Sequence, residues 1–521
     1  MNYVAIVNKC NARNRRGVVL ILVLVVIALL GLAAYSLTER MIRRYELLSL
    51  HLVQLQQREL ALSGANYSAV VVGGRVHQGE LEPIWNNVSI GPHSRTGYSF
   101  SICRSLPIGS LDLSYGLENE SAKLNLNTLP LEIEAREGCR KRLTHIPSVT
   151  VHIADAILDW MDEDNVPSQF GAESVWYSAN SREGFPKQRR FEDLRELLTV
   201  KGITPDLLYG EDLNQNGFQD VHETDLDGDG EFEFGLAGYL TVVSAERNLT
   251  DAGLKKININ NSNLVQLYRD VAQELGEEEA QFILALRLVG PVYPKEPPPP
   301  EKPEDAFDIR LRRIQEAAKR MAAKARSTNS STPASIGGLD VSGGPNFDFS
   351  SLMDLVGAVA RIEVSGEQKL VESPWQYVRY RENIDALQEK LSVTSEERIV
   401  GRININAAPV EVLESIPSIT AAKAKEMVEM RATVEDLGAT AWLYEKGLAN
   451  AAQMRAIGPY ITTGGDIRSG ISMGMIKDKV AAYAIAFEVD ATQAQPKVSR
   501  RIDLGPIPMP HVRRSTEFIA N

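Results

Sequence analysis

The chain has 521 residues, 44% of them apolar, so it exceeds what one hydrophobic core usually organises and we expect several globular units. Its 56 basic and 68 acidic side chains give a net charge of −12, which opposes a surface built to hold a polyanion, so no nucleic-acid partner is expected. Neither a P-loop nor an HExxH motif occurs, which excludes those nucleotide-binding and metalloprotease classes.

Residues 18–37 are an uncharged apolar run that predicts a membrane-spanning helix. At 1.5 Å per residue, these twenty residues cover about 30 Å, the thickness of a bilayer core. Basic residues precede the run, and such clusters stay cytoplasmic, so the bulk of the chain should face outward: Lys9, Arg13, Arg15 and Arg16. A cleaved secretory signal is the alternative, but its apolar region would be only about 7–15 residues long.

A long helix is expected to continue outward beyond the membrane. Residues 39–71 contain no proline and are rich in Leu, Gln, Glu and Arg, which favours a helical spine. Helix propensity alone does not separate such a spine from a generic stalk behind a membrane anchor.

The start of the apolar run resembles the leader of type IV pilin-like proteins. In that family a prepilin peptidase cuts after a glycine that precedes the helix, which implies cleavage between Gly17 and Val18. Most members carry glutamate at the fifth residue after the cut, and Leu22 stands there instead. Protein K of type II secretion is the member that lacks this glutamate, so the departure sharpens the resemblance to that family.

Short alternating segments after the spine predict a small sheet. Residues 98–103 and 111–115 alternate apolar and polar side chains between Gly and Pro, as strands do. The resemblance to pilins implies a sheet at this place. In an oxidising compartment Cys103 and Cys139 could form a disulfide, and two unpaired thiols are the equally open alternative.

One short motif occurs three times in the rest of the chain. Each copy has a basic residue followed by alternating aliphatic residues and asparagines, at residues 123–127, 256–260 and 402–406. The closing asparagine is expected to cap a following helix. After the first and third copies come the similar segments 146–150 and 416–420 and then helices predicted at 153–161 and 421–431, which suggests duplicated helical modules.

Two acidic stretches are candidate cation sites. The first lies where a helix ends, at 155–164, so its carboxylates oppose the helix dipole and need an offset. It resembles the Asp-Trp-x-Asp and Gly-Ala-Glu elements of the protein K family, whose periplasmic domain is associated with calcium. The resemblance implies these candidate ligands: Asp159, Asp162, Asp164 and Glu173. An acidic helix end stabilised by local hydrogen bonds is the alternative.

The second acidic stretch fits the twelve-residue calcium loop directly. It has oxygen-bearing side chains at places 1, 3, 5, 9 and 12, a backbone carbonyl at place 7 and glycine at place 6. The ligands of this loop would be Asp212, Asn214, Asn216, Phe218 (backbone carbonyl), Asp220 and Glu223. A second, incomplete loop follows, with Leu236 at place 12 and these candidates: Asp225, Asp227, Asp229 and Glu233. A solvated acidic turn is the alternative, and a structural role for calcium is favoured over a sensor.

Two further motifs suggest competing functions. Residues 412–419 look like half of a helix-hairpin-helix, which would imply a DNA-binding or competence-type membrane protein. Ser418 and Thr420 replace its glycines, and acidic neighbours oppose DNA. The Gly-x-Ser-x-Gly around Ser472, with His511, would suggest a hydrolase, but its polar lead-in favours a chance match in a loop.

The resemblance implies an α+β fold, with a pilin-like N-terminal membrane helix, a small antiparallel sheet and a large, mostly helical insertion. The expected divisions are leader 1–17, membrane helix 18–37, spine 38–72, sheet region 73–130, insertion with calcium loops 131–289, Pro/Ser/Gly-rich linker 290–346, second helical module 347–480 and C-terminal strand region 481–521. The implied function is that of a non-enzymatic minor pseudopilin at the tip of a type II secretion pseudopilus. It would sit in the inner membrane with its bulk in the periplasm, with prepilin peptidase and other minor pseudopilins as partners.

Overall fold

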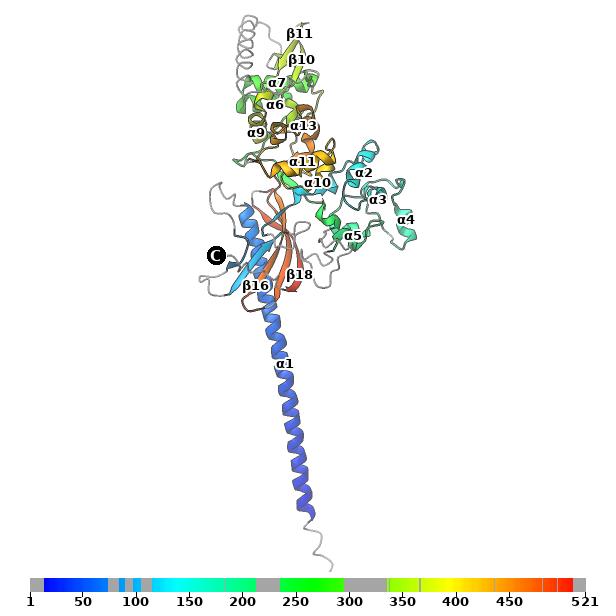
Figure 1. Ribbon diagram of the computed structural model, residues 1–521, viewed down its shortest axis with the longest axis vertical. Helices are drawn as coiled ribbons and strands as arrows, with labels where there is room; N and C mark the ends of the chain where they lie inside the picture. The colour runs from blue at the N-terminus through cyan, green and yellow to red at the C-terminus, as the bar shows by residue number, and fades with distance from the viewer. Residues whose placement is uncertain are drawn as a thin grey trace, which may run out of the picture.

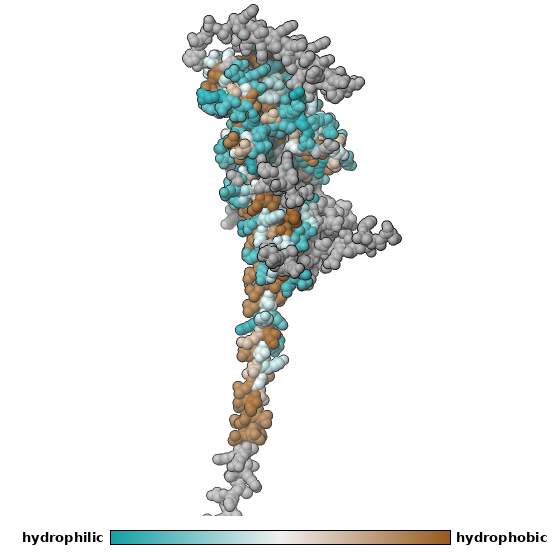
Figure 2. Space-filling view, turned by 90° about the vertical axis from the view of Figure 1, so that its left-hand side faces the viewer, coloured by the Kyte–Doolittle hydropathy of each residue, from teal (hydrophilic) through white to brown (hydrophobic). Residues whose placement is uncertain are grey.

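The computed structural model describes residues 14–73, 84–89, 97–104, 115–182, 184–211, 235–294, 335–336, 338–364, 367–434, 436–479, 481–493 and 495–508. Helix α1 (Asn14–Gly73) forms a rod that projects from the body of the molecule (Figure 1). Its lower part is the only described helix long and apolar enough to cross a membrane. The free part of the rod is brown and apolar toward its lower end in Figure 2. The helices predicted at 18–37 and 38–72 are confirmed as one continuous helix, whose length and apolar character are compatible with a membrane anchor.

The upper part of α1 packs on an antiparallel sheet built from both ends of the chain. The strand order is β1-β2-β16-β17-β18, and β3 pairs with the start of β16. The strands are β1 Val88–Ser89, β2 Tyr98–Cys103, β3 Glu118–Asn119, β16 Ile467–Ile476, β17 Ala481–Asp490 and β18 Lys497–Pro508. Strands predicted at 98–103 and after Val480 are confirmed, and so is the pilin-like α+β fold. The second helical module, expected to end at 480, gives way to the sheet at Ile467.

Helix α1 approaches β16 closely because the facing residues are small. Gly470, Ser472 and Gly474 alternate along β16, and a Cβ added to Gly474 would lie 1.9 Å from the Gln57 carbonyl oxygen of α1. A Cβ on Gly64 of α1 would lie 2.1 Å from the Ser472 hydroxyl. The Gly-x-Ser-x-Gly motif therefore lies in a buried strand, where its small residues admit the helix. Its placement in a loop was wrong.

The insertion between β3 and β16 consists of three modules, each opened and closed by a short parallel strand pair. The pairs are β4 (Leu124–Asn125) with β5 (Leu240–Thr241), β7 (Ile257–Asn258) with β12 (Leu391–Ser392), and β14 (Ile403–Asn404) with β15 (Ile461–Thr462). Each opening strand belongs to one copy of the asparagine motif, so the duplication predicted for the first and third copies extends to the second.

Helices fill each module between its two strands. The first module holds α2 Arg136–Thr144, α3 Val151–Met161, α4 Ser174–Ala179 and α5 Pro205–Tyr209. The second holds α6 Leu264–Glu274, α7 Glu277–Val289, α9 Tyr380–Lys390 and the hairpin of β10 (Val359–Val364) with β11 (Glu367–Glu372). The third holds α10 Val410–Glu414, α11 Ala421–Arg431, α12 Trp442–Glu445 and α13 Ala451–Ile457. In Figure 1 the first module lies to one side and the second lies farthest from α1. The helices predicted at 153–161 and 421–431 are confirmed.

The closing asparagine of each motif joins distant segments and does not cap the next helix. The Asn127 amide donates to the carbonyls of Phe191 (2.8 Å) and Val242 (3.0 Å) and accepts from the Phe191 N–H (2.9 Å). Asn260 makes the equivalent bonds to Phe349 and Val393. Local capping falls instead to the first asparagine of each motif, as when Asn125 accepts from the Asn127 N–H. The capping prediction therefore named the wrong asparagine.

Substitution of Asn127 by alanine should destabilise the first module by about 2–3 kcal/mol, because it leaves buried backbone groups of Phe191 and Val242 without partners. Urea unfolding of the full chain would measure the loss. Asn180→Ala is the control, because that exposed side chain makes one local bond to the Trp176 carbonyl. Equal losses in both variants would contradict the bridging role of Asn127.

Charged pairs tie the insertion to the sheet, while the hydrophobic cores stay separate. Arg500 of β18 bonds to Asp193 of the first module, and Arg398 lies 3.6 Å from Asp490 of β17. Cys139 belongs to the core of the insertion and Cys103 to a core of the sheet, and both thiols are free. The Cys103–Cys139 disulfide is therefore not formed; burial raises the pKa of the Cys103 thiol to about 12.

Candidate cation site

Helix α3 positions the acidic residues of the first module. Thr150 caps its first turn, accepting from the Ile153 N–H at 3.4 Å, and nearly every side chain from Ile153 to Met161 is buried. Trp160 is fully buried and stacks on Phe191 at a centroid distance of 6.0 Å. Because this anchor fixes the helix rotation, Asp159 on the adjacent side and Asp162 at the C-cap project toward one cluster.

Three carboxylates meet at the end of α3. Asp159, Asp162 and Glu173 are buried, and one oxygen from each lies within 4.8 Å of the others. Asp159 accepts from the Ser168 N–H (3.0 Å) and hydroxyl (2.6 Å). Among the described residues, neither Glu173 oxygen has a hydrogen-bond partner, and Oδ1 of Asp162 has none.

Arg136 of α2 is the cation that the structure places at this cluster. Its guanidinium bonds to Asp162 and lies 3.6 Å from Asp159 and 3.8 Å from Asp164. No ion pair to Glu173 is present among the described residues. Three carboxylates at −1 and one guanidinium at +1 leave a net charge of −2, which one divalent cation would neutralise.

Burial without sufficient compensation shifts the acid–base equilibria of the cluster. Desolvation, with the neighbouring carboxylates, raises the pKa of Glu173 to about 8. Desolvation also raises the pKa of Asp162 to about 7, although Arg136 opposes the shift. The pKa of Asp159 is raised by burial as well, against its bonds to Ser168. A bound cation would favour the ionised form of all three groups.

The unpartnered oxygens fit a hard cation such as Ca²⁺, which takes six to eight oxygen ligands. Glu173 could offer both oxygens and Asp162 its free Oδ1. Asp159 could offer an oxygen that also accepts a hydrogen bond from Ser168. Gly171 allows the loop to close on the cluster, because a Cβ there would lie 1.8 Å from Oδ2 of Asp159. Lys201 holds this loop by donating to the carbonyls of Phe170 and Gly171.

The structure joins three of the four residues predicted for this cluster. Asp164 remains at the rim, with its side chain 46% exposed. The candidate loops at 212–223 and 225–233 lie outside the described residues, so their calcium ligands stay a prediction. Gly17 and Val18 lie in the first turns of α1, which is compatible with the predicted cleavage site and does not test it.

Sequence reasoning missed the arginines that pair with this acidic stretch. Arg136 is far from it in sequence, and Asp155, one turn before Asp159, pairs instead with Arg140 of α2 (2.6 Å). The i, i+4 spacing of Asp155 and Asp159 could have indicated that a basic face of α2 packs against α3. Nothing in the sequence indicated which acidic groups would be left without a partner.

The hairpin that resembles a DNA-binding motif is occupied by contacts within the chain. Ser418 adopts a positive φ of 71°, and Ser148 of the first module adopts 63°, where a helix-hairpin-helix would carry glycine. Glu414, beside the hairpin, lies 3.2 Å from Nδ1 of His145, and the Ser415 carbonyl accepts from Arg142 (3.1 Å). The two hairpin regions therefore pack on each other, and no observation favours DNA binding.

Comparison with known families identifies the module that contains the cluster. Residues 122–209 match the family model described as Type II secretion system (T2SS), protein K. The chain is 26% identical over 205 residues to Type II secretion system protein K of Pectobacterium carotovorum subsp. carotovorum, which covers 37% of this chain and 60% of that protein. The protein K of Klebsiella pneumoniae is 24% identical over 205 residues, covering 36% of this chain and 59% of that protein. The chain thus spans about three fifths of these relatives.

Among solved structures, the chain is similar to one in the crystal structure of the GspK-GspI-GspJ complex from the enterotoxigenic Escherichia coli Type 2 Secretion System. The two are 11% identical, with 89% of this chain and 99% of that chain covered, at a TM-score of 0.34.

Proposed function

We propose that this chain is a member of the type II secretion protein K family and acts as a minor pseudopilin, a non-enzymatic assembly subunit of a type II secretion pseudopilus. The observation that carries this proposal is the combination of a protein K module with a membrane-length helix that continues, without a break, into a sheet-packed spine. A helix of this kind serves both as a membrane anchor and as an assembly element.

A position at the tip of the filament is supported by the shape of the molecule and by Leu22. The insertion widens the body beyond the sheet, on the side away from the projecting part of α1 (Figure 1). A buried glutamate in a helix bundle needs a partner on the next subunit, and Leu22 removes that requirement. Other minor pseudopilins are the partners that such a position implies, and the inner membrane and periplasm are the implied location.

The proposal predicts processing by a prepilin peptidase. Coexpression of the full chain with the peptidase should yield a membrane-extracted product whose first residue is Val18, and intact mass spectrometry would determine it. Gly17→Leu should block the cut and leave the longer chain, while Leu22→Val, inside the helix, should leave processing unchanged. An uncut chain, or a cut beyond Ala34, would contradict the pseudopilin assignment.

We also propose that calcium binds at Asp159, Asp162 and Glu173 and stabilises the first module. The support is the pair of unpartnered Glu173 oxygens buried beside two other carboxylates. Calcium would supply charge neutralisation and fix the loop that contains Gly171 on the end of α3.

A further inference from the structure

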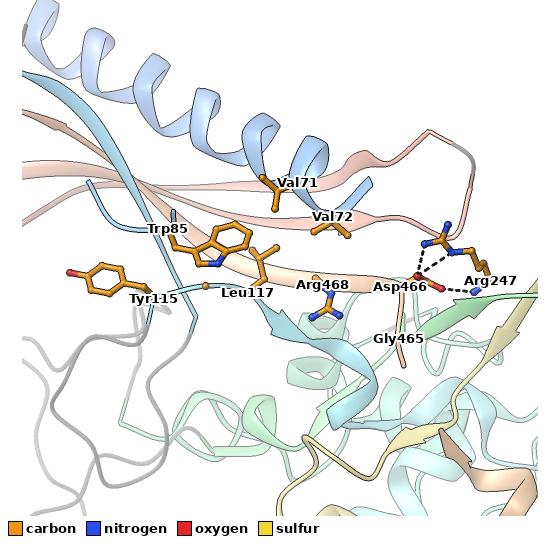
Figure 3. A pocket seen from close by; sticks show the side chains of 10 residues that line it. Val71, Val72, Trp85, Tyr115, Leu117, Arg247, Gly465, Asp466 and Arg468 are labelled. Atoms are coloured by element: carbon orange, nitrogen blue, oxygen red, sulfur yellow. Dashed lines mark hydrogen bonds and ion pairs between the residues drawn. The ribbon is translucent and has the colours of Figure 1, made fainter. Parts of the chain in front are cut away.

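A cavity of about 550 Å³ lies where the top of α1, the sheet and the insertion meet (Figure 3). The lining combines apolar side chains, among them Trp85 and Leu117, with two arginines and one aspartate. The lining residues are Val71, Val72, Trp85, Tyr115, Gly116, Leu117, Arg247, Gly465, Asp466 and Arg468. This position joins the start and the end of the insertion, so a ligand there would contact both units of the molecule.

Arg247 and Arg468 differ in whether an acidic side chain pairs with their charge. Asp466 accepts from the backbone N–H of Arg247 (2.7 Å) and from its guanidinium (3.2 and 3.3 Å), so that pair is neutral. In the part of the chain that the structure describes, the guanidinium of Arg468, on the middle strand β16, has no hydrogen bond or ion pair. Two positive charges and one negative charge leave +1 at the cavity.

The surroundings of Arg468 make this unpaired charge costly. Burial lowers the pKa of its guanidinium, and Asp466 offsets this only in part. An unpaired arginine in a confined site can gain a charge-assisted, two-pronged bond to a carboxylate, which is among the strongest side-chain interactions. The charge of +1 matches one carboxylate, and the indole of Trp85 with Leu117 offers an apolar surface beside it.

We propose that this cavity binds a carboxylate carried next to an apolar side chain, as in an acidic residue of a partner peptide. Arg468 contacts the carboxylate, and Trp85, Leu117 and Val72 contact the apolar neighbour. A peptide is favoured over a small free carboxylate because the lining sets apolar side chains beside the arginine, which matches an acidic residue flanked by an apolar one. This inference does not depend on the secretion assignment.

Fluorescence quenching of the full-length protein in detergent would test the proposal. The probe is 4-bromophenylacetate, whose bromine quenches tryptophan on contact, and its neutral amide is the reference. We expect the carboxylate to quench at about tenfold lower concentration than the amide. Trp85→Phe should remove the quenching, which assigns it to this cavity among the five tryptophans.

Variants of Arg468 separate its charge from the shape of the cavity. Arg468→Met should erase the preference for the carboxylate, and Arg468→Lys should retain part of it. Arg501→Met, on an exposed position of β18, is the matched control and should bind as the parent does. Equal quenching by carboxylate and amide, or an unchanged preference in Arg468→Met, would overturn the proposal.

Competition by blocked peptides distinguishes the two sources of a carboxylate. Acetyl-Leu-Asp-Leu-amide should displace the brominated probe from the parent protein, and acetyl-Leu-Asn-Leu-amide should not. Displacement by both peptides would show that the carboxylate is not recognised. Displacement by neither would confine the cavity to small carboxylates and overturn the assignment to a peptide.

Discussion

Replacing Gly474 by alanine should loosen the upper part of α1 from the sheet at a cost of about 3 kcal/mol. The added Cβ would lie 1.9 Å from the Gln57 carbonyl oxygen and 2.7 Å from the Ala61 amide nitrogen, so backbone must move. Neither atom belongs to a flexible side chain that could turn away. Hydrogen–deuterium exchange of residues 57–70 would measure the effect where it arises, as faster exchange of these helical amides.

Gly470→Ala is the matched control for this substitution on the same strand. Its Cβ would meet Cδ2 of Leu117 at 2.9 Å, the far end of a side chain that can rotate, and the nearest backbone atom, the Cys103 carbonyl oxygen, would lie at 3.3 Å. We therefore expect well under half the destabilisation, and almost unchanged exchange in residues 57–70. If the two variants lost equal protection there, the close contact of α1 with Gly474 would not limit the stability of this unit.

The consequence for function lies in the spine. Helix α1 contains the apolar segment 18–37 and packs on the sheet at its other end, so in the proposed membrane-anchored protein this one helix would orient the body. Loss of the Gly474 contact would leave the membrane segment intact while freeing the body to tilt. In the proposed assembly, that variant should insert in the membrane normally and fail to join a filament.

Much of this architecture could be predicted from the sequence because its signals are local. The uncharged run at 18–37 and the proline-free stretch behind it specify one long helix. Alternation at 98–103 specifies β2, and the two similar hairpins specify α3 and α11. Each of these patterns is set by neighbours in the chain, which a periodicity can report.

The remaining features depend on contacts between distant segments. The strand pair of Leu124 with Leu240, and the bonds of Asn127 to Phe191, join residues that no local pattern relates. Arg136 reaches the acidic cluster only because α2 packs on α3. Likewise, the Gly-x-Ser-x-Gly sequence around Ser472 is compatible with a loop, a catalytic turn or a strand that packs against a helix. Only the contact with α1 shows that it forms the last of these.

Removal of divalent cations should destabilise the first module in a way that depends on pH. In the cation-free protein, the pKa of Glu173 is raised to about 8 and that of Asp162 to about 7, against about 4 in the unfolded chain. Between these values the folded state holds protons that the unfolded state has lost. Its stability therefore falls as pH rises from about 4 toward 8.

Calcium should reverse this loss, since it favours the ionised carboxylates. At a free concentration one hundred times Kd, a single site adds about 2.7 kcal/mol to the free energy of unfolding. The stabilisation should be larger at about pH 8 than at about pH 6, because at lower pH calcium must displace protons from Glu173 and Asp162. Urea unfolding in chelator and in calcium, at both pH values, would measure it.

Glu173→Gln should have opposite effects in the two conditions. In chelator at about pH 8 it replaces a buried, unpartnered carboxylate by a neutral amide of the same shape, so stability should rise. In calcium it removes a ligand, so most of the stabilisation should disappear. Glu163→Gln, an exposed carboxylate in the same segment, should change neither result.

The predicted loops at 212–233 require a separate variant, because they could also bind calcium. Asp212→Asn should weaken binding there while leaving the pH dependence set by Glu173 and Asp162 intact. If Glu173→Gln kept the full calcium response and Asp212→Asn abolished it, the cation would belong to the loops. The charge of the buried carboxylates would then be compensated by Arg136 and by protonation of the carboxylates, and low pH, not a metal ion, would stabilise the cluster.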